Sequence, residues 1–194
     1  HGGGGETERA RVAPIARAER FIYIENQYLT AKSAADALVA RLRENPQVEV
    51  VAVTNYLLHG WLEAESMGIG RQLFMAQFDE PHLRRRLKVV YPVARGEAIN
   101  VHAKVLIVDD TLLRVGSANL NNRSMGFDTE CDLMIEARTA EHRAAIAALR
   151  NRLIAEHWGA HSDAVARAVA GRESVIEALE RLPRVSAERA VLNV

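Results

Sequence analysis

Residues 102–119 read HAKVLIVDDTLLRVGSAN, and the predicted fold is built outward from this stretch. His102 and Lys104 stand two positions apart at the start of a short apolar run that is typical of a β-strand. Because side chains alternate along a strand, both project from one face. A polar turn at 109–111 and a second apolar run at 112–115 predict that the chain folds back as a hairpin.

The hairpin brings the Gly-Ser-x-Asn corner at 116–119 back beside His102 and Lys104. An imidazole, an ammonium group, the Ser117 hydroxyl and the Asn119 carboxamide would then surround one small anion. Phosphoryl chemistry needs this set: a nucleophile or proton donor, a positive charge, and neutral donors for the non-bridging oxygens. Taken singly, a histidine near a lysine is usually a solvated strand edge, and Gly-Ser-x-Asn is usually a turn. The prediction therefore depends on the combined pattern.

The composition describes a chain that can bury one sizeable core, with 194 residues of which 48% are hydrophobic. Basic and acidic residues balance at 25 each, so no basic footprint for nucleic acid is expected. No apolar run approaches the roughly 20 residues of a membrane-spanning helix, and no signal peptide is visible. We expect a soluble protein or one peripheral to a membrane, in a compartment that stays unassigned. Cys131 is the single cysteine, which excludes an internal disulfide, and we expect it to be buried.

Strand-like and helix-like segments alternate through the first half of the chain, which predicts an α/β fold with a strand–helix–strand crossover. Positions 1–5, HGGGG, are interpreted as a linker stump or appended residues, and a weak helix is expected over 6–19. A helix capped at Ser33 is expected to start the first crossover. Thr139 and Gly159 mark the two ends of a later helix. The expected strands are 20–25, 48–54, 87–93 and 129–137 besides the hairpin, and the expected helices are 34–45, 139–158, 163–170 and 173–182.

Asn26 and Gln27 follow the first predicted strand, where open α/β sheets place ligand contacts; an ordinary polar turn is the alternative. Glu130 lies on the strand after the corner, where a carboxylate is costly without a partner, so we expect a cation beside it. Asp109 belongs to the far end of the hairpin and is interpreted as a structural residue. Residues 55–78 concentrate Trp, Met and Phe among glycines. They form either ordinary core packing or an apolar wall beside the site that contacts acyl chains.

The spacing His-x-Lys, four residues, Asp, six residues, Gly-Ser-x-Asn resembles the HKD signature of the phospholipase D superfamily. The stretches YIENQY at 23–28 and NLNNRS at 119–124 resemble the lipid-acting branch and the cardiolipin synthases. The resemblance implies a three-layer α-β-α half with a mixed central sheet and C-terminal helices. It is closest to the C-terminal half of a bacterial enzyme with two tandem halves, with 6–159 as the catalytic half and 160–194 as a helical extension. Such enzymes use two HKD motifs, and only one is present here.

What the resemblance implies for mechanism is a two-step displacement at phosphorus through a phosphohistidine intermediate. His102 would serve as general acid/base or nucleophile, with Glu130 orienting it. Lys104, Asn119, Asn26 and Gln27 would hold phosphate oxygens, Ser117 would assist, and Asp109 and Gly116 would be structural. No metal or other cofactor is expected, and His142, His157 and His161 lack companions for a metal set.

Three functional interpretations stay open. The first is hydrolysis or phosphatidyl transfer on phospholipids, with an N-terminal HKD half or a second copy of the chain as partner. The second is a homodimeric nuclease or phosphodiesterase, which the balanced charge disfavours. The third is a half-domain that is inactive without its partner half.

Overall fold

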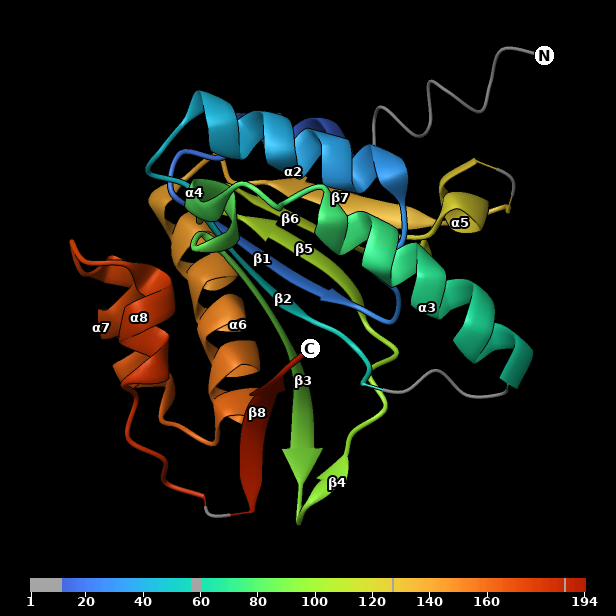
Figure 1. The fold of residues 1–194 in the computed structure, drawn as a ribbon. Coiled ribbons are helices and arrows are strands. Elements are labelled where there is room, and N and C mark those ends of the chain that lie inside the picture. The colour runs from blue at the N-terminus through green and yellow to red at the C-terminus, as the bar shows by residue number, and fades with distance from the viewer. Residues whose placement is uncertain (1–11, 57–60, 127, 187) are drawn as a thin grey trace.

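The computed structural model describes residues 12–56, 61–126, 128–186 and 188–194. The predicted linker at 1–5 and most of the weak helix expected over 6–19 lie outside these residues. Within them the strands form one mixed sheet in the order β4-β3-β2-β1-β5-β6-β7, with β8 pairing β3 (Figure 1). The strands are β1 (Phe21–Asn26), β2 (Glu49–Val53), β3 (Leu87–Ala94), β4 (Glu97–Ala98), β5 (Lys104–Val108), β6 (Leu112–Gly116), β7 (Asp132–Glu136) and β8 (Arg189–Asn193).

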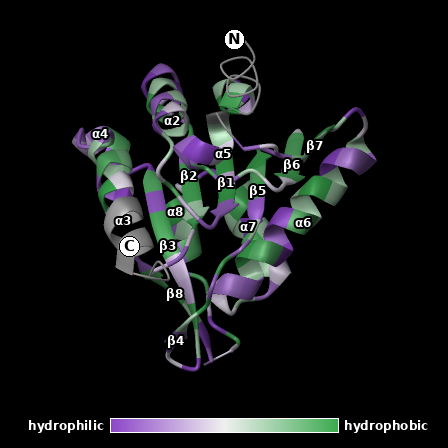
Figure 2. Ribbon diagram, turned by 90° about the vertical axis from the view of Figure 1, so that its right-hand side faces the viewer, coloured by the Kyte–Doolittle hydropathy of each residue, from purple (hydrophilic) through white to green (hydrophobic). Residues whose placement is uncertain are grey.

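Helices cover both faces of this sheet, which confirms the predicted three-layer fold (Figure 2). One core cluster joins α2, α3 and α4 to the sheet through residues such as Leu38, Phe74 and Leu83. The other joins α6, α7 and α8 to the opposite face through residues such as Ile154 and Val165. The helices are η1 (Ala13–Arg17), α2 (Lys32–Glu44), α3 (Trp61–Ala76), α4 (Pro81–Arg84), α5 (Asn122–Gly126), α6 (Ala140–Trp158), α7 (Ser162–Ala170) and α8 (Val175–Glu180).

The central strands are buried because helices pack on both of their faces. All six residues of β1 are buried, and in β2 every residue after Glu49 is buried. The predicted crossover is confirmed, since β1 and β2 pair in parallel with Phe21 opposite Glu49 and α2 connects them. Parallel pairing of β2 with β3 extends this half of the sheet, while β5, β6 and β7 add to it antiparallel.

Helix α6 begins and ends where its sequence predicts. The Thr139 hydroxyl accepts a hydrogen bond from the His142 N–H at 3.2 Å, and Gly159 closes the helix in the left-handed conformation with φ of 61°. The expected cap at Ser33 is wrong, because α2 already begins at Lys32. The Lys32 N–H donates instead to Asn122 Oδ1 at 3.1 Å, so a residue ninety positions away satisfies the first turn.

The C-terminal segment contains more than the helices expected from its sequence. Beyond α7 and α8 it ends in β8, which pairs antiparallel with β3, with Tyr91 opposite Leu192. Residues 189–193 therefore belong to the central sheet. Among the described residues no helix combines the length and the apolar character needed to cross a membrane.

Candidate active site

The strand registers bring three separate segments to one edge of the sheet. Asn26 at the end of β1 lies opposite Lys104 at the start of β5. Val105 pairs with Val115, so the end of β6 and the Gly-Ser-x-Asn corner lie at the same edge. The predicted hairpin is confirmed, and the structure brings the ends of β1, β5 and β6 together.

Lys104 is largely buried at this edge, with 8% of its surface exposed. Its Nζ donates to the backbone oxygen of His102 at 2.8 Å and to Gln27 Oε1 at 3.2 Å. Burial lowers the pKa of the Lys104 ammonium, and the negative charge of Glu130 acts in the opposite direction. Gln27 and Lys104, both predicted from sequence, therefore form one contact that orients the ammonium group.

Asn26 ties the end of β1 to the corner after β6. Its Oδ1 accepts hydrogen bonds from the backbone N–H groups of Leu120 at 2.9 Å and Tyr28 at 3.2 Å. The side chain is buried, and its oxygen is engaged within the protein. A direct contact between Asn26 and a phosphate stays a prediction, whereas its contacts here hold the corner against β1.

The Ser117 hydroxyl connects the corner to the segment that leads into β7. It donates to Glu130 Oε2 at 2.6 Å and accepts from the Cys131 N–H at 2.9 Å. Within the described part of the chain, the hydrogen-bond partner of the Glu130 carboxylate is thus Ser117 and not the His102 imidazole. Cys131 is exposed, which corrects the expectation that it is buried; β7 is the sheet edge, and the chain entering it is open to solvent.

His102 and Asn119 each have a polar side-chain atom without a hydrogen-bond partner among the described residues. The His102 side chain is exposed, and its ring makes no hydrogen bond to the residues that the structure describes. The Asn119 Oδ1 atom is buried and also lacks a partner there. An unsatisfied buried carboxamide is costly, and a half-turn of the amide would direct its NH₂ group to the same position. Because that position is closed to solvent, a contact between Asn119 and a phosphate stays a prediction.

Asn55 is a site residue that sequence reasoning missed. It lies two residues after the end of β2, and its side chain reaches the loop before His102. Its Oδ1 accepts from the Val101 N–H at 2.5 Å, and its Nδ2 donates to Asn100 Oδ1 at 3.1 Å. A polar residue at the carboxyl end of a buried parallel strand was the available signal.

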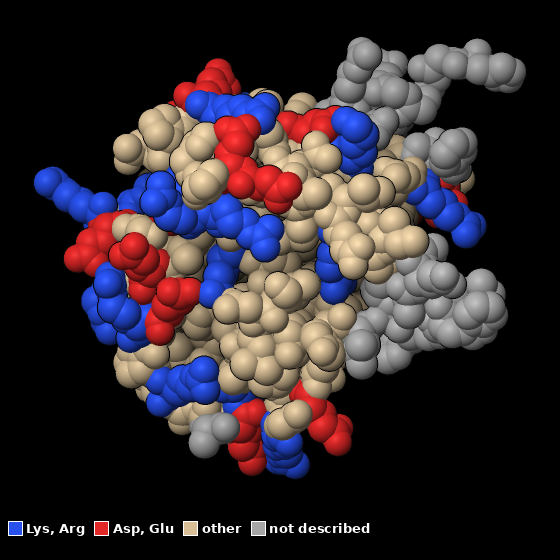
Figure 3. Space-filling view, in the orientation of Figure 1, with Lys and Arg blue, Asp and Glu red and all other residues tan. Residues whose placement is uncertain are grey.

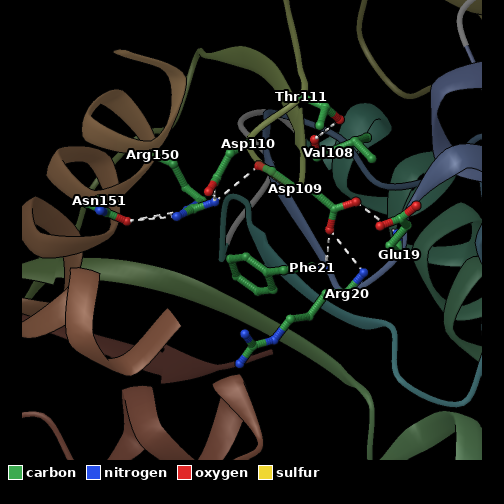
Figure 4. A network of polar contacts seen from close by, with 9 residues as sticks. All are labelled: Glu19, Arg20, Phe21, Val108, Asp109, Asp110, Thr111, Arg150 and Asn151. Carbon is green, nitrogen blue, oxygen red and sulfur yellow. Dashed lines mark hydrogen bonds and ion pairs between the residues drawn. The ribbon is translucent and has the colours of Figure 1, made fainter. Parts of the chain in front are cut away.

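The opposite end of the hairpin is held by Asp109 (Figure 4). Its carboxylate accepts from the backbone N–H groups of Glu19 at 2.8 Å, Arg20 at 3.0 Å and Phe21 at 2.8 Å. Arg150 donates to the Asp109 carbonyl oxygen and pairs with Asp110 in the same network. Asp109 therefore anchors the start of β1 to the hairpin turn, away from His102.

Gly116 lies where no side chain fits. A Cβ atom built on it would overlap Asp132 Oδ1 and the Cys131 carbonyl oxygen. This close approach lets β7 follow the corner, and it keeps Glu130 within reach of Ser117.

Sequence reasoning also missed a second buried polar cluster, which connects β1 to α6. The Tyr23 hydroxyl donates to Glu25 Oε1 at 2.5 Å, and His157 Nε2 lies 3.1 Å from the same oxygen. Burial and the Glu25 charge raise the pKa of Tyr23 well above its ordinary value. Among the described residues, no group of three or more His, Cys, Asp and Glu side chains is arranged to hold a metal ion.

The geometry defines the class as an α/β fold with a mixed sheet, in which polar residues from three strand ends gather at one edge. The family model described as cardiolipin synthase, PLD-like domain matches residues 12–156. The chain therefore belongs to the phospholipase D-like family, and phosphodiester chemistry is the class of reaction that this membership supports.

Two relatives are similar over nearly the whole chain. The chain is 25% identical over 245 residues to phospholipase D delta of Arabidopsis thaliana, covering 93% of this chain and 28% of the relative. It is 26% identical over 228 residues to phospholipase D1 of Schizosaccharomyces pombe, covering 90% of this chain and 16% of the relative. The chain thus spans under a third of either relative. Both are eukaryotic proteins, so a bacterial source stays a prediction.

Three solved structures share the fold at low identity. The phosphatidylserine synthase of Haemophilus influenzae has a TM-score of 0.59 at 18% identity, over 78% of this chain and 36% of that one. NucT from Helicobacter pylori has a TM-score of 0.55 at 16% identity, over 78% and 89%. Nuc from Salmonella typhimurium, a phospholipase D family member, has a TM-score of 0.50 at 19% identity, over 74% and 84%.

Proposed function

We propose that this chain supplies one of two His-x-Lys sites in an enzyme that hydrolyses or transfers the phosphodiester of a phospholipid. The observation that carries the proposal is the convergence of His102, Lys104 and the Ser117–Asn119 corner at one sheet edge. An exposed imidazole beside a buried ammonium group combines a reactive nitrogen with fixed positive charge. Similarity to phospholipases D in two eukaryotes favours a phospholipid as substrate.

The proposed reaction proceeds in two displacements. An imidazole nitrogen attacks phosphorus, so a P–N bond forms while the P–O bond to the leaving alcohol breaks. The second histidine gives that alcohol its proton. It then removes a proton from water or an acceptor alcohol, whose oxygen attacks phosphorus and breaks the P–N bond. His102 takes one of these two roles, and a partner's histidine takes the other.

The remaining residues hold the phosphoryl group. Lys104 and the Asn119 carboxamide bind non-bridging oxygens, and Gln27 keeps the ammonium group in place. The Ser117 hydroxyl, which donates to Glu130 here, would bind the same oxygens after turning its proton toward the phosphate. Glu130 would orient His102 through the carboxylate oxygen that Ser117 does not use. No step in this scheme requires a metal ion.

A partner is needed because the sequence holds one His-x-Lys motif. An apolar face close to the site supports a protein partner: Val115 of β6 lies opposite Leu133 of β7, and both are exposed. Ile135, two residues further along the same face, is exposed as well. β7 is one of the edge strands of the described sheet. An N-terminal half of a longer chain or a second copy of this chain would cover this face.

The test uses a phospholipid assay in the competent assembly, which is either the chain with its N-terminal half or the dimer. His102→Ala is expected to abolish turnover with the folded state retained. His82→Ala, which changes an exposed histidine of α4, is the matched control and should keep full activity. Rapid quenching with labelled substrate should trap an acid-labile, base-stable phosphoprotein. A His102→Ala enzyme with more than a small fraction of wild-type turnover would refute the proposed role.

The partner surface has its own test by light scattering. Leu133→Glu should prevent assembly and activity together, whereas Val185→Glu, at an equally exposed position away from the site, should not. An active homodimer would favour the self-sufficient phosphodiesterase. The mixed charges on the face in Figure 3 give no support to a nucleic-acid substrate, and salt-sensitive DNA binding would revive that alternative.

A further inference from the structure

A groove of about 290 Å³ lies between α2 and α3, beside the candidate active site. Ala35, Gly70, Leu73 and Phe74 provide its apolar lining, and Asn122 lies at its polar end. Phe74 is buried, whereas Leu73 is 62% exposed. The groove therefore has an apolar floor and an apolar rim open to solvent.

The groove depends on a close approach between α3 and the chain that follows β1. A Cβ atom added at Gly70 would lie 2.9 Å from Thr30 Cβ, whereas one added at Gly68 would meet nothing within 4 Å. Glycine inside a helix costs about 1 kcal/mol relative to alanine, so a packing reason is expected where it is kept. Gly70 has that reason, since it sets α3 directly against Thr30.

The groove adjoins the chain that leaves the Gly-Ser-x-Asn corner, since Thr30 and Asn122 belong to its lining. The backbone N–H groups of Thr30 and Ala31 both donate to the Leu120 carbonyl oxygen at 2.9 Å, one residue beyond Asn119. Thr30 also follows Gln27, the partner of Lys104, by three positions. A ligand whose phosphate is held by Lys104 and Asn119 therefore has this groove as its neighbour.

The chemistry of the lining favours an uncharged hydrocarbon chain. Lys32, the cation at the rim, is paired with Asp36 through two contacts of 2.7 and 2.9 Å, which leaves little charge to attract an acid or a second phosphate. Exposed aliphatic surface such as Leu73 gains free energy when an apolar ligand covers it. A flexible chain of methylene groups matches both the shape and the polarity of this groove.

We propose that the groove between α2 and α3 binds an acyl chain of the diester substrate, an inference that rests on the proposed function. The phosphate is held at Lys104 and Asn119, and the acyl chain runs past Thr30 between Ala35 and Leu73. Such a subsite would make long-chain phospholipids better substrates than water-soluble diesters.

The first test measures binding of alkyl phosphates of increasing length by calorimetry, all below their micelle-forming concentrations. Each methylene that enters the groove should lower Kd by up to about fourfold, until the groove is full. Leu73→Gln should flatten this dependence. Ile69→Gln changes an exposed aliphatic residue one turn earlier on α3, outside the groove lining, and should leave the dependence intact.

If Leu73→Gln and Ile69→Gln lose the chain-length dependence equally, α3 contacts lipid in general. That result would refute the groove as the acyl-chain subsite. A nitroxide on the alkyl tail gives an independent readout, since it should broaden the Ala35 methyl resonance selectively. Failure of the groove and of the proposed function are distinguishable. If affinity depends on Lys104, as measured with Lys104→Gln, but not on chain length, the groove alone is refuted. If Lys104→Gln changes no affinity, the phosphate is bound elsewhere, and both proposals fall.

Discussion

The side chain of Asn55 holds the backbone of Val101, the residue immediately before His102. The Asn55 oxygen accepts the Val101 N–H at 2.5 Å, and both residues are buried. The end of β2 thus positions the loop that delivers the imidazole. A loop between a short β4 and β5 would otherwise have few contacts to define where His102 lies.

Asn55→Ala should therefore lower kcat for the phosphodiester without removing the reactive groups. Loss of a buried hydrogen-bond acceptor costs about 1–3 kcal/mol, so we also expect a lower Tm. Asn55→Asp keeps an acceptor for Val101 but loses the donor to Asn100, and should restore part of the activity. A purely structural role predicts that kcat recovers whenever Tm does. Unchanged kcat in Asn55→Ala would contradict positioning by this residue.

Lys104→Arg should reduce turnover strongly although the charge is retained. The ammonium group makes two defined contacts in a slot with 8% exposure, and a planar guanidinium cannot reproduce them. We expect at least a tenfold fall in kcat/KM, measured with the competent assembly. Lys88→Arg is the control, since Lys88 lies on β3 and pairs there with Glu180 of α8. Comparable activity in Lys104→Arg and wild type would refute the point-charge requirement.

Stability should fall above about pH 10 through Tyr23. Its pKa is raised in the folded state from the ordinary value of 10.0, so the folded protein retains this proton more strongly than the unfolded chain. The resulting stabilisation is fully present below pH 10 and is lost as pH rises through the folded-state pKa. Chemical unfolding between pH 8 and 11 should show a decline that is shallower in Tyr23→Phe. Replacing the exposed Tyr56 by Phe should leave the decline in place.

Substitution by alanine is expected to change stability in opposite directions at Gly116 and Gly68. At Gly116 a Cβ would overlap backbone and side-chain atoms of 131–132, and such overpacking typically costs about 1–3 kcal/mol. At Gly68 a Cβ enters open space on α3, where alanine should stabilise the helix by about 0.5–1 kcal/mol. Denaturant unfolding of both variants measures the difference. Equal stability of Gly116→Ala and wild type would mean that β7 can shift away at little cost.

Local patterns were sufficient to predict most of the secondary structure. Alternation and apolar runs predicted β1, β2, β3 and the hairpin, because the apolar side chains that bury these strands are visible in the sequence of each strand. Thr139 and Gly159 predicted the ends of α6 because capping is made by neighbours in sequence. The signature spacing identified Lys104, and the position of Gln27 after the first predicted strand identified the residue that contacts it.

Contacts between remote segments decided the rest. Ser33 is a good capping residue by type, yet α2 starts earlier because Asn122 satisfies its first N–H. Residues 189–193 carry no signal that tells a tail from a sheet strand, and their pairing depends on the open edge of β3.

The sequence by itself determined the family, the hairpin and the residue types at the site, because these depend on order and spacing along the chain. Only the tertiary structure decided that Glu130 bonds to Ser117, that Asn55 holds the loop before His102, and that α3 leaves a groove beside Thr30. The physical reason is that a buried polar group takes whichever partner the packing brings within hydrogen-bond distance. That partner can lie anywhere along the chain, so spacing in the sequence does not reveal it.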